Sequence, residues 1–390
     1  MSGFVRRLRK QLFLVLSAVL ILTWSAWAQP PVKNVIMMIG DGMGINHVTA
    51  ARISLEDGAY SQLNMDTLPY TGFSITFSNN NLVTDSAAAA TALATGFRTD
   101  NKRLGTLPNG APAKSIMLRA KEQGLSTGVV ATVTLTDATP AGYLVQADSR
   151  AFEKDIARAI LAAEADVLLG GGLDIFGANP FTKEPRPNSL LSEAMQMGYT
   201  YVSSREELLA VEITPDLKLI GLFMGENMSF ELTRFSTEPT LTEMTKRALE
   251  LVGQNPKGFF LMVEGSRIDH AGHTNSIPEL IGDVLAFDQA VGAALEYAQN
   301  HPDTLLIVTA DHETGGLGIT SGLPDGDRVN YGWLSTNHTA AMVPVYAYGP
   351  GAHRFTGTFH LTEIPIRTAE LMGISNFPQI IEQKAAEAAQ

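Results

Sequence analysis

The sequence predicts an α/β fold, with a mostly parallel central sheet sandwiched between helices. Short apolar runs typical of buried strands alternate with longer segments of helical periodicity. The composition, 45% hydrophobic and 17% charged, is sufficient to bury a large core. Polar clusters directly follow four of the apolar runs, as ligand-binding residues do at the carboxyl ends of parallel strands.

Six apolar runs are predicted strands, several of them apolar throughout, as strands buried on both faces are. They are residues 35–39, 127–133, 218–223, 259–263, 305–309 and 343–348. The predicted helices between and after them are residues 152–165, 241–253, 279–299 and 361–372. Residues 176–188 contain three prolines and predict a surface loop or small insertion. With no internal repeat or low-complexity linker, we expect one catalytic domain over residues 29–390.

Residues 1–28 have the order of a signal peptide. Four basic residues precede an apolar run at 12–22, and Ala26-Trp27-Ala28 then supplies small residues for cleavage after Ala28. A retained membrane anchor is the alternative, but the apolar run is short for a bilayer span. We therefore expect a periplasmic or secreted protein that is free of the membrane after cleavage.

The charge and the absence of cysteine restrict the chemistry. Without cysteine, disulfides, thiolate metal sites and a cysteine nucleophile are excluded. The formal net charge of −12 becomes −16 once residues 1–28, with four basic and no acidic residues, are removed. Such a surface repels nucleic acid, so no nucleic-acid partner is expected. An anion-binding site here needs local positive charge, which bound metals can supply.

One acidic residue follows each of four predicted strands: Asp41, Asp137, Glu264 and Asp311. The carboxyl ends of parallel strands meet at one sheet edge, so these side chains are expected to converge. Unpaired carboxylates would repel one another, and bound divalent cations would remove the repulsion. Asp41 alone could equally belong to an ordinary Asp-Gly turn.

Two motifs combine imidazole with carboxylate, the ligand set that suits zinc. Residues 264–273 read Glu-Gly-Ser-Arg-Ile-Asp-His-Ala-Gly-His, and a second pair is Asp311-His312. A polar loop with incidental histidines is the alternative for the first motif. His338 becomes a candidate ligand only in the company of these residues. The four histidines without such neighbours are assigned no role: His47, His301, His353 and His360.

Ser86 is the candidate nucleophile. It begins a helix-forming run of alanines, with Thr84 or Asp85 as the predicted cap. In the first turn, free N–H groups and the helix dipole favour an anion. Taken alone, Ser86 is an ordinary serine near a cap. The chain has no Gly-x-Ser-x-Gly elbow, which disfavours a Ser-His-Asp hydrolase. Activation of the serine by a bound metal is then expected in place of a general base.

Taken together, these motifs resemble those of the alkaline phosphatase family, in particular its compact bacterial members, over roughly residues 32–350. The matching residues occur in the family's order and spacing: Asp41, Asp85-Ser86-Ala-Ala, Asp137-Ala-Thr139-Pro, Arg150, residues 264–273, Asp311-His312 and His338. The resemblance implies hydrolysis of phosphate monoesters through a phosphoserine at Ser86. It also implies a homodimer.

The resemblance further implies two zinc ions and one magnesium ion. The first zinc is expected on Asp269, His273 and His338, and the second on Asp311 and His312, with Ser86 beside it. Asp41 links the second zinc to a magnesium site completed by Thr139 and Glu264. Arg150 is expected to bind phosphate oxygens. Members of the family differ at the positions of Asp137 and His270, which leaves the identity of the third metal open.

Two other functions stay open at this point. Phosphodiesterases share the superfamily, although they typically use threonine as the nucleophile. A non-catalytic zinc-binding or phosphate-binding protein would keep the ligands but have no use for the Ser86 hydroxyl. A sulfatase is disfavoured because Ser86 is followed by alanines and not by Pro-x-Arg.

Overall fold

A computed structural model describes residues 31–179 and 181–382 of the chain. From Val32 onward these residues form one compact unit. The predicted signal peptide, residues 1–28, lies outside the described residues. None of the described helices is both long enough and apolar enough to cross a bilayer.

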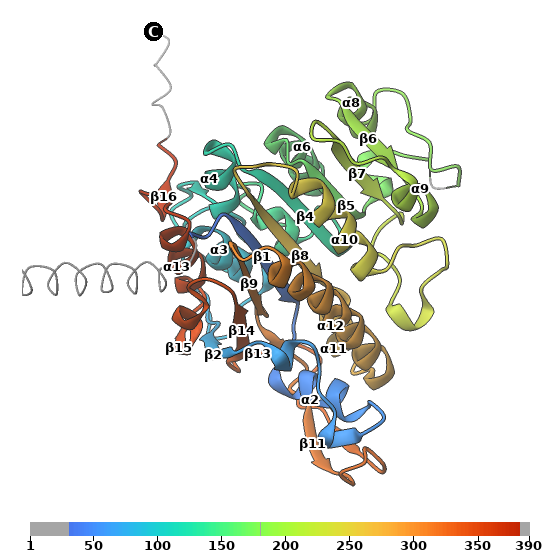
Figure 1. The fold of residues 1–390 in the computed structure, drawn as a ribbon, viewed down its shortest axis with the longest axis vertical. Helices are drawn as coiled ribbons and strands as arrows, with labels where there is room; N and C mark the ends of the chain where they lie inside the picture. The colour runs from blue at the N-terminus through green and yellow to red at the C-terminus, as the bar shows by residue number, and fades with distance from the viewer. Residues whose placement is uncertain (1–30, 180, 383–390) are drawn as a thin grey trace, which may run out of the picture. The chain divides into compact units, whose positions relative to one another are not determined.

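A ten-stranded sheet forms the centre of the fold (Figure 1). All neighbouring strands are parallel except the two pairs made by β14, which runs antiparallel to β2 and β9. All six predicted strands are present. Across the sheet the strands are β15 (Gly357–His360), β2 (Tyr70–Ile75), β14 (Val343–Tyr348), β9 (Thr304–Thr309), β1 (Asn34–Gly40), β8 (Phe259–Gly265), β4 (Ser126–Thr134), β5 (Val167–Gly171), β7 (Lys218–Leu222) and β6 (Tyr199–Val202).

Strand β1 is buried on both faces because side chains alternate along an extended strand. Met37 packs into one hydrophobic cluster and Met38 into the other. Met38 is in register with Val263 of β8 and Val308 of β9, so three apolar strands lie side by side at the centre. This arrangement explains the continuous apolar runs that predicted these strands.

Helices cover both faces of the sheet, as the sequence predicted. The cluster that contains Met37 includes residues of α3 (Ser86–Thr95), α4 (Ile116–Glu122), α5 (Ala138–Gly142), α6 (Glu153–Ala163), α7 (Leu173–Phe176), α8 (Leu190–Gln196) and α13 (Glu363–Leu371). The other includes residues of α2 (Ile45–Ile53), α9 (Arg205–Ala210), α10 (Leu241–Val252), α11 (Arg267–His273) and α12 (Ile277–Asn300). In Figure 1, α10 and α12 lie in front of the sheet.

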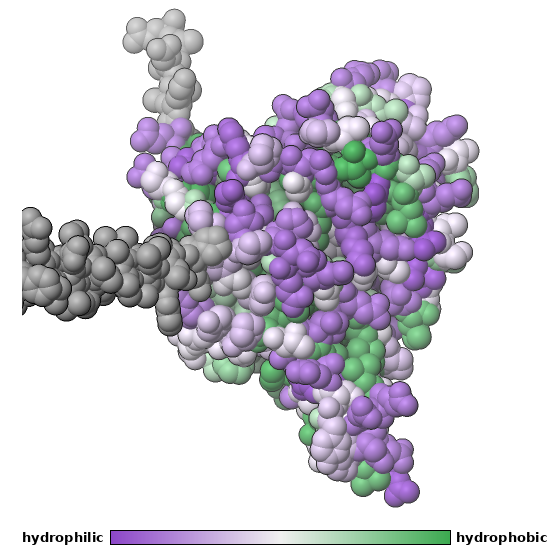
Figure 2. Space-filling view, in the orientation of Figure 1, coloured by the Kyte–Doolittle hydropathy of each residue, from purple (hydrophilic) through white to green (hydrophobic). Residues whose placement is uncertain are grey.

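Three short strand pairs and four 3-10 turns complete the described fold. β10 (Glu313–Thr314) pairs with β13 (His338–Thr339), β11 (Gly318–Ser321) with β12 (Asn330–Gly332), and β16 (Gln379–Ile380) with β3 (Ala113–Lys114). The 3-10 turns are η1 (Gly58–Tyr60), η2 (Met65–Thr67), η3 (Glu231–Thr233) and η4 (Ala352–Phe355). The segment 176–188, predicted as a loop, begins at the last residue of α7. Its described residues, which exclude residue 180, then contain no helix or strand beyond an isolated bridge between Ala178 and Pro185. The face shown in Figure 2 is mostly hydrophilic, with small scattered apolar groups.

Candidate active site

The ends of the central strands lie level with one another and bring acidic side chains to one edge of the sheet. Ile39 of β1 is in register with Glu264 of β8 and Thr309 of β9. Asp41 and Asp311 follow directly after these strands, and both are buried. The predicted convergence of acidic residues at one sheet edge is therefore present in the structure.

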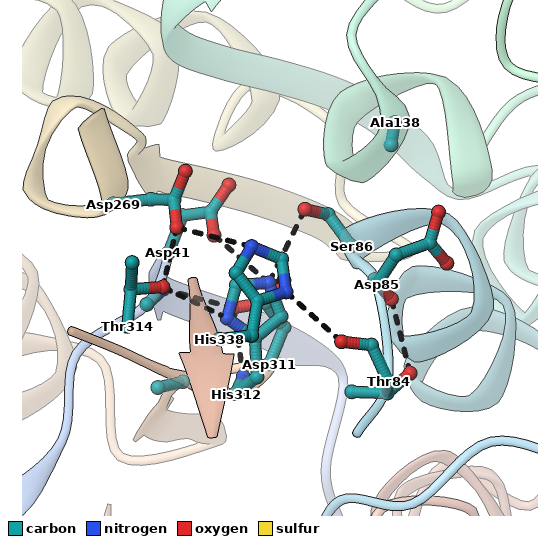
Figure 3. A network of polar contacts seen from close by, with 12 residues as sticks. Asp41, Thr84, Asp85, Ser86, Ala138, Asp269, Asp311, His312, Thr314 and His338 are labelled. Carbon is teal, nitrogen blue, oxygen red and sulfur yellow. Dashed lines mark hydrogen bonds and ion pairs between the residues drawn. The ribbon is translucent and has the colours of Figure 1, made fainter. Parts of the chain in front are cut away.

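Asp41, Asp311 and His312 form one group of potential metal ligands (Figure 3). The His312 Nε2 atom lies 3.1 Å from Asp311 Oδ2 and 3.5 Å from Asp41 Oδ1. The other oxygen of Asp311, Oδ1, accepts hydrogen bonds from the backbone N–H groups of Gly42 and His312, at 3.1 and 2.9 Å. This holds Asp311 with its Oδ2 atom directed at the His312 ring.

Asp269, His273 and His338 form a second group. Asp269 and His273 are four residues apart on α11 and so lie on one face of the helix. Their side chains approach to 3.2 Å, and His338 Nε2 lies 3.4 Å from Asp269 Oδ1 and 3.2 Å from His273 Nε2. Strand β13 brings His338 to this group from 65 residues away in the sequence. His338 also stacks on His312, with ring centroids 3.6 Å apart, so the two groups are adjacent.

Both histidines of the second group are oriented by backbone carbonyls. His273 Nδ1 lies 2.7 Å from the Thr336 carbonyl oxygen, and His338 Nδ1 lies 2.9 Å from that of Thr84. A carbonyl only accepts, so each Nδ1 carries a proton, and each Nε2, which faces the Asp269 carboxylate, is the atom available to a metal once it gives up its own proton. This is the arrangement that histidine ligands of metals usually show.

The charges of the second group are strongly coupled. The hydrogen bond that His273 donates to the Asp269 carboxylate raises the pKa of His273 to about 9. Burial alone would raise the pKa of Asp269, but hydrogen bonds from His273 and His338 hold it well below its usual value. Asp269 is thus an anion in a buried position, where it needs cationic partners.

A third group consists of buried oxygen atoms that lack hydrogen-bond partners. They are Asp41 Oδ1, Thr139 Oγ1 and both carboxylate oxygens of Glu264. Burial first, and then neighbouring carboxylates, raise the pKa of both Asp41 and Glu264 well above the usual range. The hydroxyls of Thr139 and Ser266 lie close enough to Glu264 to oppose this shift, although neither makes a hydrogen bond of normal geometry. Buried oxygens without partners are uncommon, and a hard cation such as magnesium would satisfy this set.

Ser86 is the first residue of α3, and its side chain faces the first group of potential ligands. Its Oγ atom is 3.2 Å from His312 Nε2, and Figure 3 shows the two side chains pointing toward each other. Asp85, and not Thr84, is the helix cap, because its side chain accepts a hydrogen bond from Ala88 N at 3.0 Å. Ser86 is the first residue of the helix, where unpaired N–H groups favour an anion, as the sequence predicted.

Arg150 reaches the same region from the loop before α6. Its Nη2 atom donates to Asp137 Oδ1 at 3.0 Å, and Nη1 lies 3.8 Å from Asp85 Oδ2. Although burial alone would lower it, the pKa of Arg150 is raised by the carboxylates of Asp137 and Asp85. Arg150 therefore supplies a fixed positive charge next to the nucleophile helix.

His270 contacts a neighbour on its own helix. Its Nδ1 atom pairs with Arg267 Nη1, and the Arg267 guanidinium lies 3.8 Å from the ring centre of Phe230. Burial and the Arg267 charge lower the pKa of His270, which leaves the ring neutral. The carboxylates of Asp269 and Asp137 oppose this effect.

The sequence reasoning missed residues that support the ligands. Thr314 donates to Asp269 Oδ1 at 2.5 Å and lies 3.3 Å from His312 Nδ1. It comes two residues after His312, which in an extended segment places both side chains on one side, and this spacing could have indicated it. His47 is buried, with its Nε2 atom 3.4 Å from Glu313 Oε1, and belongs to the layer behind the site.

Comparisons with known proteins agree with this geometry. The sequence profile of the family described as "Alkaline phosphatase" matches residues 32–326. Alkaline phosphatase 4 of Bacillus subtilis is 34% identical, over 85% of this chain and 87% of its own. The crystal structure of a cold-active alkaline phosphatase from Shewanella sp. has a TM-score of 0.78 at 32% identity and covers 87% of this chain and 99% of its own. A variant of TAB5 alkaline phosphatase, solved with magnesium in its M3 site, has a TM-score of 0.78 at 30% identity and covers 88% and 99%.

Proposed function

Because the chain belongs to the alkaline phosphatase family, it is a hydrolase of phosphate monoesters, and we propose that Ser86 is its nucleophile. The observation that carries this proposal is the position of Ser86. Its hydroxyl lies at the N-terminus of α3, 3.2 Å from Nε2 of His312, which belongs to the first group of potential metal ligands and stacks on His338 of the second. No other reactive hydroxyl is needed to explain the site.

The ligand groups support two zinc sites and one magnesium site. The proposed first zinc ligands are Asp269, His273 and His338, and the proposed second zinc ligands are Asp311 and His312. Asp41 would join the second site to a magnesium site with Thr139 and Glu264, whose oxygens lack partners. When bound, such cations lower the pKa of a nearby hydroxyl and stabilise charge on attacking and leaving oxygens.

The remaining roles, those of the nucleophile and of the group that binds the phosphoryl oxygens, are assigned to side chains of the protein. Ser86 Oγ attacks phosphorus, forming an O–P bond as the bond from phosphorus to the alcohol oxygen breaks. Arg150 holds two non-bridging oxygens of the phosphoryl group in its planar fork. Water then attacks the phosphoserine, which releases inorganic phosphate and restores the Ser86 hydroxyl.

We propose magnesium as the third metal. The oxygen-only set of Asp41, Thr139 and Glu264 favours it, and a structural relative was solved with magnesium in its M3 site. His270 is the residue that could alter this choice, because imidazole favours zinc. Elemental analysis of the purified protein should give zinc and magnesium in a ratio of about two to one on this ligand count. Three zinc ions without magnesium would exclude the assignment.

Export and dimerisation are part of the proposal. The order of basic, apolar and small residues in 1–28 supports cleavage after Ala28 and release into the periplasm or medium. N-terminal sequencing of the exported protein should begin at Gln29. Family membership supports a homodimer, and light scattering should give twice the mass of one chain.

The test of function compares the wild type with Ser86→Ala. Wild-type protein loaded with zinc and magnesium should release p-nitrophenol from its phosphate monoester at alkaline pH. Ser86→Ala should lose at least about a thousandfold in kcat/KM, as removal of a nucleophile does. The matched control is Ser192→Ala on α8, the helix packed against the edge strand β6, which should keep full activity.

Two other results would redirect the assignment. Faster cleavage of bis-p-nitrophenyl phosphate than of the monoester would favour the phosphodiesterase alternative. Bound zinc with no turnover of either ester would favour a non-catalytic binding protein.

A further inference from the structure

A short segment between the nucleophile helix and Arg150 contacts both of them. We call residues 101–104 the linking segment. It contains none of the residues that the motifs singled out, and it follows α3 after a short loop. Its side chains and backbone make hydrogen bonds in two directions, toward the start of α3 and toward the chain that carries Arg150.

On one side, the linking segment holds the residues that precede Ser86. The Asn101 side chain accepts a hydrogen bond from Asp85 N at 3.1 Å and donates one to the Val83 carbonyl at 3.0 Å. The Lys102 backbone N–H donates to Asp85 Oδ2 at 2.9 Å. One amide thus binds the backbone on both sides of Thr84, and the helix cap is fixed directly before Ser86.

On the other side, the same segment runs antiparallel to residues 147–150. Leu104 and Ala147 exchange two backbone hydrogen bonds, of 3.0 and 2.8 Å. Arg103 Nη1 donates to Asp148 Oδ1 at 2.7 Å. The Arg150 backbone N–H donates to the Lys102 carbonyl at 2.8 Å.

Lys102 is the point at which the two sets of contacts meet. Its φ angle is 76°, in the left-handed region that residues other than glycine seldom adopt. In this conformation its N–H group faces Asp85 while its carbonyl receives the Arg150 N–H. Such backbone conformations persist where surrounding contacts over-determine them, and they are concentrated near functional sites.

We propose that Asn101 is a positioning residue that fixes the spacing between Ser86 and Arg150. The inference rests on the proposed roles of these two residues. In-line displacement at phosphorus needs the attacking oxygen and the fork that holds the phosphoryl oxygens at a set separation. A misplacement of about 1 Å can reduce the rate about a hundredfold. Asn101 contributes without touching the substrate, by holding Asp85 and Val83 against the segment that carries Arg150.

The test is Asn101→Ala, with two readouts on protein loaded with zinc and magnesium. One is kcat/KM for p-nitrophenyl phosphate, and the other is the Kd for inorganic phosphate from calorimetry. We expect kcat/KM to fall about tenfold to a hundredfold. We expect phosphate to bind about threefold to tenfold more weakly, because part of a charge-assisted hydrogen bond is lost. The matched control is Asn109→Ala, an exposed asparagine whose amide only caps the turn at Ala111, and it should change neither value.

A purely structural role is distinguished by repeating the binding measurement in an Arg150→Ala background. If Asn101 acts through Arg150, adding Asn101→Ala there should change the phosphate Kd by less than about twofold, because coupled residues are not additive. An equal loss of affinity in both backgrounds would overturn the proposal. So would an Asn101→Ala protein with wild-type phosphate affinity and turnover.

Two further results remain informative. If Asn101→Ala does not fold, Asn80→Ala removes the 3.0 Å hydrogen bond from the Asn101 backbone N–H to Asn80 Oδ1, together with the 3.2 Å hydrogen bond that Asn80 Oδ1 accepts from the Ser78 hydroxyl. That variant should show a smaller loss of phosphate affinity, and an unchanged affinity would overturn the proposal. A wild type that binds phosphate without hydrolysing esters would overturn the proposed function, while the affinity measurements would still decide the role of Asn101.

Discussion

Thr314 shows how a single side chain can hold two proposed metal ligands in place. Its hydroxyl is buried, donates to Asp269 Oδ1 at 2.5 Å and lies 3.3 Å from His312 Nδ1. One proposed ligand from each of the two groups is therefore in contact with the same hydroxyl. Groups of this kind orient ligands and maintain their charge without binding the metal themselves.

We predict that Thr314→Val weakens zinc binding about tenfold to a hundredfold, the usual effect of removing such a partner. Valine has nearly the same shape as threonine but cannot donate to Asp269, which would be left with fewer partners in a buried position. Competition with a chelator of known affinity measures the change. Thr200→Val, at an exposed position on the edge strand β6, is the control. Equal zinc affinity in the two variants would show that the hydroxyl has no such role.

Asp283 on α12 gives a pH-dependent prediction away from the ligands. Burial raises its pKa to about 7, although its carboxylate accepts a hydrogen bond from Glu231 N at 3.3 Å. Below pH 4 the group is protonated in both the folded and the unfolded chain. Between about pH 4 and 7 only the unfolded chain loses the proton, so stability falls as pH rises. Above pH 7 both forms are ionised and the penalty is constant.

Asp283→Asn should therefore stabilise the protein increasingly from pH 5.5 to 7.5, by at most about 4 kcal/mol, and by a constant amount above that. Asparagine keeps an acceptor for the Glu231 N–H group. Urea unfolding at several pH values measures the difference. The exposed Asp216→Asn makes the same change of charge and should show no such trend. An Asp283→Asn advantage that shrinks as pH rises would contradict the sign of the argument.

At the scale of residues, the sequence indicated the candidate ligands and nucleophile more readily than the side chains that hold them in position. Asp269 and His312 were proposed from their motifs, and Ser86 from its place at a helix start and from the family resemblance; the structure brings the three side chains close together. Thr314 and Asn101 were missed because threonine and asparagine are common, and their roles depend on hydrogen bonds between distant segments. Those contacts follow from the fold and have no local pattern.

Among the elements, the short pair β10 and β13 has the largest effect on the site. Glu313 and Thr314 lie in β10, directly after His312, and His338 lies in β13. Two residue pairs define this ladder, so it depends on side-chain contacts for support. Glu313 provides them, because its carboxylate accepts from Gly316 N at 2.8 Å and also from the Thr339 hydroxyl.

Gly44 leaves room for Glu313, which leads to a prediction at this scale. A Cβ atom at Gly44 would lie 2.3 Å from Glu313 Cγ, and the buried Glu313 has no free space to move into. Gly44→Ala should therefore shift β10 and β13, destabilise the protein by about 1–3 kcal/mol as overpacking does, and reduce zinc content. Urea unfolding and metal analysis measure both effects. Gly332→Ala in β12, where nothing lies within 4 Å of the new atom, should be silent.

Strands were predicted from the sequence where both faces of the strand are buried, because the apolar run is then continuous. β1, β8 and β9 are buried along their whole length, have continuous apolar centres and were all predicted. β2, β5, β6 and β15 were missed for other reasons. β2 alternates between buried and more exposed positions, and β15 is a four-residue edge strand in which only Phe359 is buried. β6 is the four-residue strand at the opposite edge, and β5 ends in two glycines. These features remove the continuous apolar signal without removing the strand.

For the whole molecule, the parallel sheet is what makes an acidic metal site possible. Parallel strands bring Asp41, Glu264 and Asp311 to the same edge, where burial first and then four neighbouring carboxylates raise the pKa of Asp41. The topology was predictable because helices alternate with strands, and the sheet-edge rule then located the site. The order of the strands, and the antiparallel placement of β14, could not be derived from local patterns.

The stability of the whole molecule should depend on pH in opposite directions with and without metal. In metal-free protein the pKa values of Asp41 and Glu264 are raised, so stability falls as pH rises above about 4, where only the unfolded chain ionises. Metal binding requires deprotonated ligands, so its stabilising effect grows with pH. Urea midpoints of loaded and chelator-treated protein should converge near pH 5 and separate toward pH 9. Metal-free Asp41→Asn should show a weaker pH dependence than metal-free wild type. A constant separation would mean that these carboxylates are not the ligands.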